Sequence, residues 1–244
     1  MTALPTKRLE EWRYSDIAAV ERVWPVAPEA LTVPAGAHDT KLVVQDAAAG
    51  SATIRHFVIT IEAGASLAFH ILNVGGAYGR VALDVSLHEG ATFDLGGIIL
   101  AAGEQVLEIV TTVRHLGPGA TSRQVVRCVA GDTATATYLG KVAVAREGQK
   151  TDAAQSFKAL LLDRGATANA KPELEIFADD VKCAHGATVG ELDRNALFYL
   201  ESRGVPPVEA RALLTRAFLS DALESLEDDT VRESVEAQVT ALLA

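Results

Sequence analysis

The sequence has few of the features that mark several large classes of protein. It contains only two cysteines, Cys128 and Cys183, in 244 residues, which excludes a disulfide-rich secreted scaffold. No apolar run is long enough to cross a membrane, and residues 1–16 lack the apolar segment of a signal peptide. We therefore expect a protein of the cytoplasm, with both thiols reduced and no membrane partner.

Basic residues are also in short supply. Lys and Arg number 22 against 32 Asp and Glu, so the net charge is −10, and no run of basic residues offsets it. Because such a chain repels phosphate backbones, nucleic acid is not an expected partner. The patterns HExxH, GxSxG and GxxxxGK followed by Ser or Thr are absent. Metalloprotease, nucleophile-elbow and phosphate-loop chemistry are therefore not predicted.

What the chain does contain, between residues 31 and 190, is the pattern of a β-rich core. Short apolar or alternating runs are bounded by glycine and polar residues, and no helical period passes through them. The pairs Gly75-Gly76 and Gly96-Gly97 are interpreted as turns, and Cys128 as a core residue. We expect strands at 41–44, 54–61, 67–72, 81–87, 106–113, 123–129 and 142–145.

A weak internal repeat runs through the same region. Gly-Ala followed by Ser or Thr begins at Gly64, Gly90, Gly119, Gly165 and Gly186, with degenerate copies at Gly36 and Gly148. Most steps between copies are 26 to 29 residues, and the last two are 17 and 21. A repeat of that length built from strands favours a β-solenoid, and a jelly roll is the alternative architecture.

Helical patterns flank the core on both sides. In residues 1–30, Thr6 is expected to cap a helix that reaches Ile17. In residues 191–244, Asp193 caps a helix through Ser202, Gly204 follows it, and Pro206-Pro207 opens the next. The buried face of this second helix is expected to comprise Ala210, Leu213, Leu214, Ala217 and Phe218. A third helix carries Val231, Val235, Val239 and Leu242.

The residue pair most suggestive of chemistry is Cys183 and His185. Two residues apart on a strand, their side chains point to the same face. A thiolate and an imidazole together can bind a soft or borderline metal, but a closed tetrahedral site needs four ligands. The remaining ligands must come from elsewhere, for example from another subunit. The other histidines are single and are interpreted as core or surface residues, and Asp179 and Asp180 would face opposite ways on a strand.

A set of motifs connects these observations to a known family. Arg8–Asp16 reads RLEEWRYSD, and further motifs lie at 115, 121–122, 140–142, 149–153, 160–162, 171–176, 179–190, 197–200 and 202–204. With these motifs the chain resembles the SufB/SufD family of iron–sulfur cluster assembly proteins, and the SufD branch more closely than the SufB branch. Ser156 stands about where SufB-like chains carry an essential Cys, which favours SufD. The chain is shorter than many SufD proteins in the N-terminal helical region.

The resemblance implies a fold and a set of partners. It implies a right-handed parallel β-helix at residues 31–190, a short N-terminal helical segment at 1–30 and a C-terminal helical domain at 191–244. It also implies a non-catalytic scaffold that pairs with a SufB-like paralogue through the β-helix and docks a SufC-like ATPase through the helices. The isolated chain would bind no cofactor stably, would hold iron or an iron–sulfur cluster only transiently in the complex, and could form a homodimer.

The resemblance also assigns roles to individual residues. His185 corresponds to the SufD histidine implicated in cluster assembly, with Cys183 as an auxiliary ligand. For the ATPase contact we expect Asn195, Phe198, Tyr199, Arg203 and Phe218, although aromatic residues there can instead pack the helices onto the core. Two other functions remain open from the sequence: a β-solenoid enzyme acting on a carbohydrate or small molecule, and a homo-oligomeric binding module.

Overall fold

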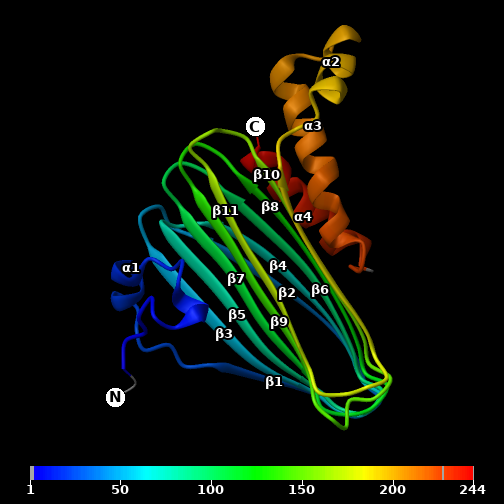
Figure 1. The fold of residues 1–244 in the computed structure, drawn as a ribbon. Helices are drawn as coiled ribbons and strands as arrows, with labels where there is room; N and C mark the ends of the chain where they lie inside the picture. Colours follow the sequence, from blue (N-terminus) through cyan, green and yellow to red (C-terminus); the bar gives the residue numbers. More distant parts are fainter. Residues whose placement is uncertain (1–2, 227, 244) are drawn as a thin grey trace.

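Two parallel sheets form the body of the computed structural model, which describes residues 3–226 and 228–243 (Figure 1). The chain alternates between the sheets, so that two successive strands make one turn of a parallel β-helix. Sheet A contains β1 (Glu29–Val33), β3 (Ala52–Ile61), β5 (Tyr78–Leu87), β7 (Val106–His115), β9 (Thr135–Val144) and β11 (Thr167–Ile176), and sheet B contains β2 (His38–Ala47), β4 (Ser66–Gly75), β6 (Thr92–Ala101), β8 (Thr121–Ala130), β10 (Asp152–Leu161) and β12 (Lys182–Gly190). The solenoid is confirmed, and the jelly roll is excluded because that fold is antiparallel.

Each of the seven expected strands is present, with different boundaries. Five further strands, β1, β6, β10, β11 and β12, have no counterpart among them, although Cys183 and His185 were expected to lie on a strand and do so in β12. Gly96-Gly97 is not a turn, because both residues lie inside β6, whereas Gly75 and Gly76 do form a turn with positive φ. A side chain at Gly97 would come within 3.1 Å of Ile109, so the missing Cβ lets the two sheets pack closely there.

The full copies of the Gly-Ala repeat at Gly64, Gly90 and Gly119 mark the turns that lead into three strands of sheet B. Gly64, Gly90 and Gly119 have positive φ, which L-residues rarely adopt, and each lies in the turn before β4, β6 or β8. The turns are bonded to one another: the Gly64 N–H donates to Glu89 O at 2.8 Å. The copies at Gly165 and Gly186 are false, because the first precedes a strand of sheet A and the second lies inside β12.

The lumen between the sheets is packed with the inward side chains of each strand. In the middle of the β-helix these side chains are apolar, and Cys128 is one of them, as expected. Aromatic rings meet across the lumen, with Phe57 and Phe69 edge to face at 5.3 Å and Tyr138 stacked on Phe157 at 5.5 Å. This interior supplies most of the apolar burial that stabilises the solenoid.

The N-terminal segment covers part of sheet A. The expected helix from Thr6 to Ile17 is wrong: the segment forms a short 3-10 helix, η1 (Glu10–Trp12), and then α1 (Ile17–Glu21), which Asp16 caps. Tertiary contacts hold it in this form. The guanidinium of Arg80 on β5 lies 3.9 Å from the Trp12 ring and pairs with Glu108 on β7 at 2.7 Å.

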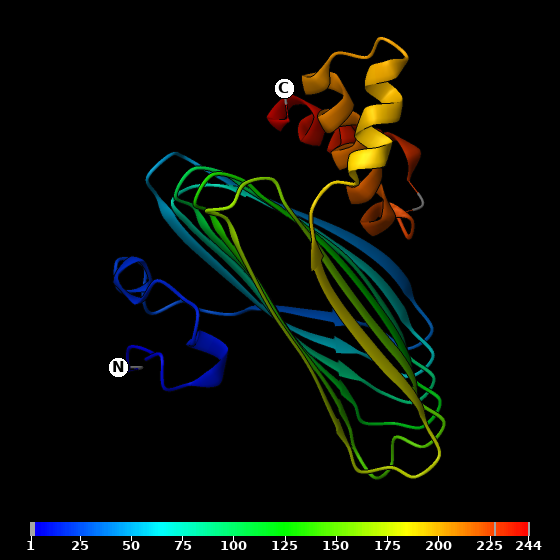
Figure 2. The same cartoon turned by 45° about the horizontal axis from the view of Figure 1, so that its top comes forward.

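The C-terminal helices lie on the opposite side of the molecule, over sheet B (Figure 2). They are α2 (Arg194–Ser202), α3 (Pro207–Ser220), the 3-10 helix η2 (Asp221–Leu223) and α4 (Asp229–Leu242). The expected N-cap Asp193 accepts the N–H of Asn195, and α3 begins with Pro207 as expected.

The buried face of α3 differs from the expected one. Its buried residues are Ala210, Thr215 and Leu219, whereas Leu213 and Ala217 are exposed. The face is rotated because Leu219 joins a cluster with outward residues of sheet B, and this contact decides which side of the helix is covered.

Candidate functional site

The last turn of the β-helix is open. β12 pairs with β10 on one edge and β11 pairs with β9, and the outer edges of β11 and β12 have no strand beside them among the described residues. Such an edge presents unpaired backbone N–H and C=O groups that can pair with another chain. Apolar side chains are also exposed near it, including Phe177 and Val189.

Cys183 and His185 lie on β12 and face the lumen at this open end. Cys183 is in register with Ala153 of β10, and His185 is in register with Gln155. Both partners are buried inward residues, and register partners in parallel strands share a face. The structure therefore places the two side chains on one face.

The two candidate ligands differ in exposure. Cys183 is half-buried beside Val142, Val144 and Ala153, and burial raises the pKa of its thiol. A thiol with a raised pKa is a poor nucleophile by itself but loses its proton readily when a metal binds it. The His185 side chain is exposed, so a partner that covers the open end would contact it directly.

Beneath His185, the lumen changes from apolar to polar. The row of inward residues that ends in His185 runs Phe69, Leu95, Gln124, Gln155 and His185, one residue per turn. Gln124 Oε1 accepts hydrogen bonds from Thr111 Oγ at 2.8 Å and from Tyr138 OH at 3.2 Å. Gln155 is 4 % exposed, and neither polar atom of its amide has a hydrogen-bond partner among the residues that the structure describes. Nothing in the sequence pattern pointed to this polar row.

The two ligands do not form a complete metal site. Within residues 3–226 and 228–243, no group of three or more His, Cys, Asp or Glu side chains could hold a metal ion. Asp179 and Asp180 lie in the bend between β11 and β12 rather than on a strand. There Asp180 forms an ion pair with Lys150, so it links two successive turns of the solenoid.

The expected ATPase-docking residues separate into two groups. Phe198 and Tyr199 on α2 are 72 % and 56 % exposed, and the Arg203 guanidinium lies 5.0 Å from the Tyr199 ring. Asn195 is also exposed, on the first turn of α2. Phe218 on α3, in contrast, is half-buried against the cluster that joins the helices to sheet B. The exposed aromatic pair thus lies on α2, which projects away from the sheets (Figure 1).

A buried arginine connects the helices to the strand beside β12. Arg127 of β8 donates from Nε to Asp221 Oδ2 of η2 at 2.8 Å. It also donates from Nη1 to the backbone oxygen of Ser156 on β10 at 2.9 Å, and from Nη2 to Ser156 Oγ at 3.1 Å. Because the guanidinium lies beside it, the pKa of the Asp221 carboxyl is held below its usual value. No sequence pattern indicated this contact, because it joins residues 94 positions apart.

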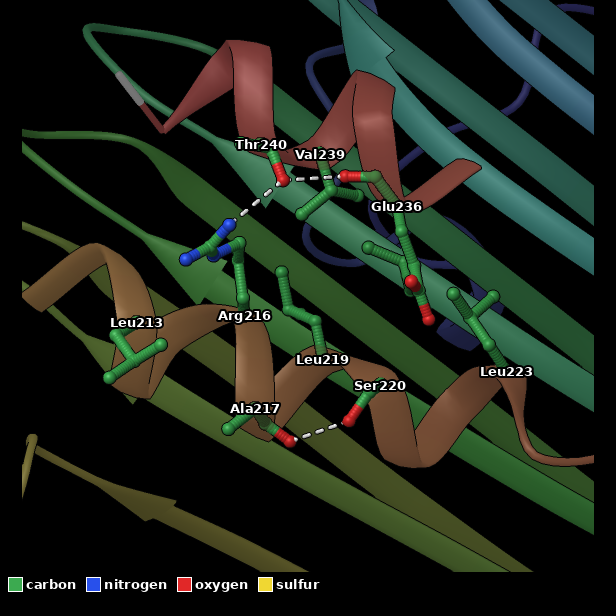
Figure 3. A pocket seen from close by; sticks show the side chains of 10 residues that line it. Leu213, Arg216, Ala217, Leu219, Ser220, Leu223, Glu236, Val239 and Thr240 are labelled. Atoms are coloured by element: carbon green, nitrogen blue, oxygen red, sulfur yellow. Dashed lines mark hydrogen bonds between the residues drawn. The ribbon is translucent and has the colours of Figure 1, made fainter. Parts of the chain in front are cut away.

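A pocket of about 310 Å³ opens between α3 and α4 above sheet B (Figure 3). Leu219, Leu223 and Val239 are among its lining residues, and Arg216 donates to Thr240 Oγ1 at 3.5 Å across it. Because its lining is mostly apolar, we interpret the pocket as a packing gap between the two helices. None of the expected site residues lines it.

The remaining histidines are in the places that the sequence suggested. His70 and His115 are fully buried, and His115 Nε2 lies 2.9 Å from Ser122 Oγ. Burial lowers the pKa of His115 to about 4. His38 is exposed, and His56 and His88 lie on the outer surface beside Asp84 and Glu62. None of the helices in the described part of the chain has the length and apolar character needed to cross a bilayer.

Comparison with known proteins gives one consistent result. Residues 27–218 match the family described as SUF system FeS cluster assembly, SufBD core domain. The chain is 33 % identical over 171 residues to the iron–sulfur cluster assembly protein SufD of Escherichia coli, an alignment that covers 70 % of this chain and 40 % of that protein. It is also 33 % identical over 202 residues to the protein ABCI7, chloroplastic, of Arabidopsis thaliana, which covers 82 % of this chain and 42 % of the relative. The chain thus spans well under half the length of these relatives.

Proposed function

Because this chain belongs to the SufBD core family of the SUF system, we propose that it is a SufD-like, non-catalytic scaffold that assists iron–sulfur cluster assembly in the cytoplasm. In this role it pairs with a SufB-like paralogue through the last turn of the β-helix and docks a SufC-like ATPase through its C-terminal helices. The cluster is the cargo of the complex rather than a resident cofactor of this chain.

The observation that carries the proposal is the open last turn with a cysteine and a histidine, two residue types that can bind metal, at its mouth. Cys183 and His185 can supply two of the four ligands of a tetrahedral iron, and the unpaired edge of β12 can receive a partner strand. A partner that pairs with this edge brings its own side chains next to His185. One partner could therefore pair with the unpaired edge and complete the half-site. Because the homologues are cluster assembly proteins, we propose that this partner is a SufB-like chain.

The helices offer a second contact surface and a connection to the site. Phe198 and Tyr199 form an exposed aromatic surface on α2, a composition typical of interface cores. A force applied there by ATP-driven closure of the ATPase would pass through α3 to Asp221, then through Arg127 to Ser156. Ser156 is the next residue to Gln155 and is in register with Gly186, the residue after His185. Movement of the helices would in this way reshape the cluster site.

Native mass spectrometry of this chain co-expressed with the SufB and SufC homologues of its own genome tests the assembly. We expect one copy of SufB, two of SufC and one of this chain. Assembly of the other subunits without it would refute the scaffold role. If the chain then formed homodimers through the β12 edge, the homo-oligomeric binding module would become the better interpretation.

A histidine variant tests the site within the assembled complex. His185→Ala is expected to leave the complex intact and to reduce the yield of clusters, because one ligand is removed without changing the strand pairing. His38→Ala, an exposed histidine on β2 at the other end of sheet B, is the control and should have no effect. A full cluster yield from His185→Ala would remove that residue from the mechanism.

Reversal of one charge tests the docking surface. Arg203→Glu removes the cation above the Tyr199 ring and should weaken binding of the ATPase at least tenfold, without unfolding the chain. Arg146→Glu makes the same charge change in the exposed turn before β10, away from the helices, and serves as the control. Equal ATPase affinities for the two variants, measured by surface plasmon resonance, would place the docking surface elsewhere.

A further inference from the structure

We propose that Gln155 is the positioning residue of His185. Its amide oxygen accepts the N–H of the imidazole, which leaves the other ring nitrogen unprotonated and directed at the mouth of the β-helix, where it can bind iron. The inference rests on the proposed function of His185 as an iron or cluster ligand, and it adds a residue that no sequence pattern indicated.

The first support is the place of Gln155 in the lumen. It is in register with His185 on the neighbouring strand, and adjacent parallel strands lie about 4.8 Å apart. Both side chains point to the same face, so the Gln155 amide lies within reach of the imidazole ring. Across the lumen the neighbours of the row are Thr111 and Tyr138, whose hydroxyls are already bonded to Gln124.

The second support is that the Gln155 amide is buried and unpaired. Within residues 3–226 and 228–243, both Oε1 and Nε2 lack a hydrogen-bond partner, although the side chain is only 4 % exposed. A buried polar group without a partner is costly, and native structures rarely retain one without a reason. The exposed His185 ring can relieve this cost by turning onto the amide, because it is free to choose its rotamer.

Gln124 determines which way the amide of Gln155 is turned. Since Gln124 Oε1 accepts two hydrogen bonds, from Thr111 and Tyr138, its own amide orientation is fixed and its Nε2 remains as an unpaired donor. Gln155 is in register with Gln124, and its Oε1 is an acceptor that has no partner among the described residues. An amide oxygen has two lone pairs, so it can accept from Gln124 and from His185 at once. The row thus orients the imidazole from within the lumen.

This arrangement matches the way in which proteins prepare histidine ligands. A metal-bound imidazole almost always donates its second N–H to an oxygen acceptor, which fixes the tautomer and the ring plane, and loss of that acceptor typically weakens metal binding 10- to 100-fold. A carboxamide oxygen meets this need without adding a charge to the lumen. Cys183 has no such partner in its row, where Ala153 and Ser122 lie beneath it.

The tautomer of His185 is the direct test. In the chain labelled with nitrogen-15 histidine, long-range proton–nitrogen NMR spectra should show one dominant tautomer for His185, assigned by its loss in His185→Ala. Gln155→Met, which keeps the volume and removes the acceptor, should return the ring to the tautomer mixture of free histidine. Gln155→Glu, which keeps an oxygen acceptor, should preserve the single tautomer. Gln45→Met removes another lumen amide, bonded to Asn73 near the opposite end, and should leave His185 unchanged.

Titration with Zn²⁺ alone, followed by calorimetry, distinguishes metal binding by His185 from its positioning by Gln155. The unmodified chain should bind Zn²⁺ more tightly than His185→Ala, and Gln155→Met should weaken its binding 10- to 100-fold. Equal Zn²⁺ affinity of the unmodified chain and His185→Ala would refute the ligand role of His185, and with it this inference. Intact Zn²⁺ binding by Gln155→Met with an unchanged His185 tautomer would refute only the positioning by Gln155.

Discussion

At Gly96 the C-terminal helices come close to sheet B. Gly96 lies on the outer face of β6, and a Cβ built there would be 2.0 Å from the backbone oxygen of Ala222 in η2. Real Cβ atoms essentially never come within 3.0 Å of another heavy atom, and a backbone oxygen cannot swing aside as a side-chain tip can. Gly96→Ala must therefore push η2 away from the sheet by about 1 Å.

The size of the effect follows from two competing energies. Overpacking of this kind costs about 1–3 kcal/mol. Complete release of η2 and α3 would expose Leu219 and Leu223, which are buried against sheet B, and would cost about 3–6 kcal/mol for these two side chains alone. The strain is smaller than the cost of release, so we expect the helices to stay docked but to open more often. A loss of 1–3 kcal/mol corresponds to opening about 5 to 150 times more frequent.

Hydrogen–deuterium exchange followed by mass spectrometry measures this opening. Amides of α3 should exchange about 5 to 150 times faster in Gly96→Ala, while those of β4 and β8 keep their rates. Gly97→Ala is the matched control, on the same strand but facing the lumen, where the new methyl meets only side-chain carbons of Ile109 and Val126 at 3.1 Å or more. Equal exchange of α3 in the two variants, or faster exchange throughout the β-helix, would refute the reasoning.

Three further predictions concern buried charged and polar groups. Glu108→Ala leaves the buried guanidinium of Arg80 without its carboxylate and should lower the free energy of unfolding, measured in urea titrations, by about 3–5 kcal/mol. A variant as stable as the unmodified chain would contradict this expectation. Burial lowers the pKa of His115 from 6.5 to about 4, so as the pH falls the unfolded chain binds a proton before the folded chain does. The contribution of His115 to the free energy of unfolding is therefore complete above pH 6.5 and falls by about 3 kcal/mol towards pH 4. His115→Gln should flatten this pH dependence in thermal melts at several pH values. Asp221→Asn weakens the contact with Arg127 and should cost only about 1 kcal/mol, since Asp221 is partly exposed, but it should separate ATPase activity from cluster yield in the assembled complex.

The sequence predicts this fold because the solenoid depends on short-range patterns. Alternating apolar residues and turn glycines recur once per turn, and both signals survive in a single chain. The alternating pattern fails to predict a strand where glycine or a polar residue replaces an apolar one inside it. β6 contains Gly96, whose close contact with η2 requires glycine, next to Gly97 in the lumen, and β10 carries the polar Gln155 among its inward residues.

The site was only half visible from the sequence. The spacing of Cys183 and His185 places them on one face, and that inference needs nothing beyond the period of a strand. The residue beneath His185 could not be found in the same way. Gln155 lies 30 positions earlier, and the register that brings the two together depends on the lengths of two turns. The N-terminal helix failed for a related reason, because contacts of Arg80 and Trp12 override the local preference.

Differences in the number of residues per solenoid turn occur in the loops between the strands from β2 to β11, not in those strands. Each strand from β2 to β11 has ten residues, yet His38 pairs with Ser66, a step of 28 residues, and Thr121 pairs with Asp152, a step of 31. An added residue inside β10 would move Gln155 to the outer face and Ser156 to the lumen, which would disrupt the His185 row and the Arg127 contact together. An added residue in a turn leaves both intact. Fluorescent or spin labels inserted at exposed turns, such as that around Asp163 and Arg164, can therefore report on the complex without disturbing the lumen face or the outer face of sheet B.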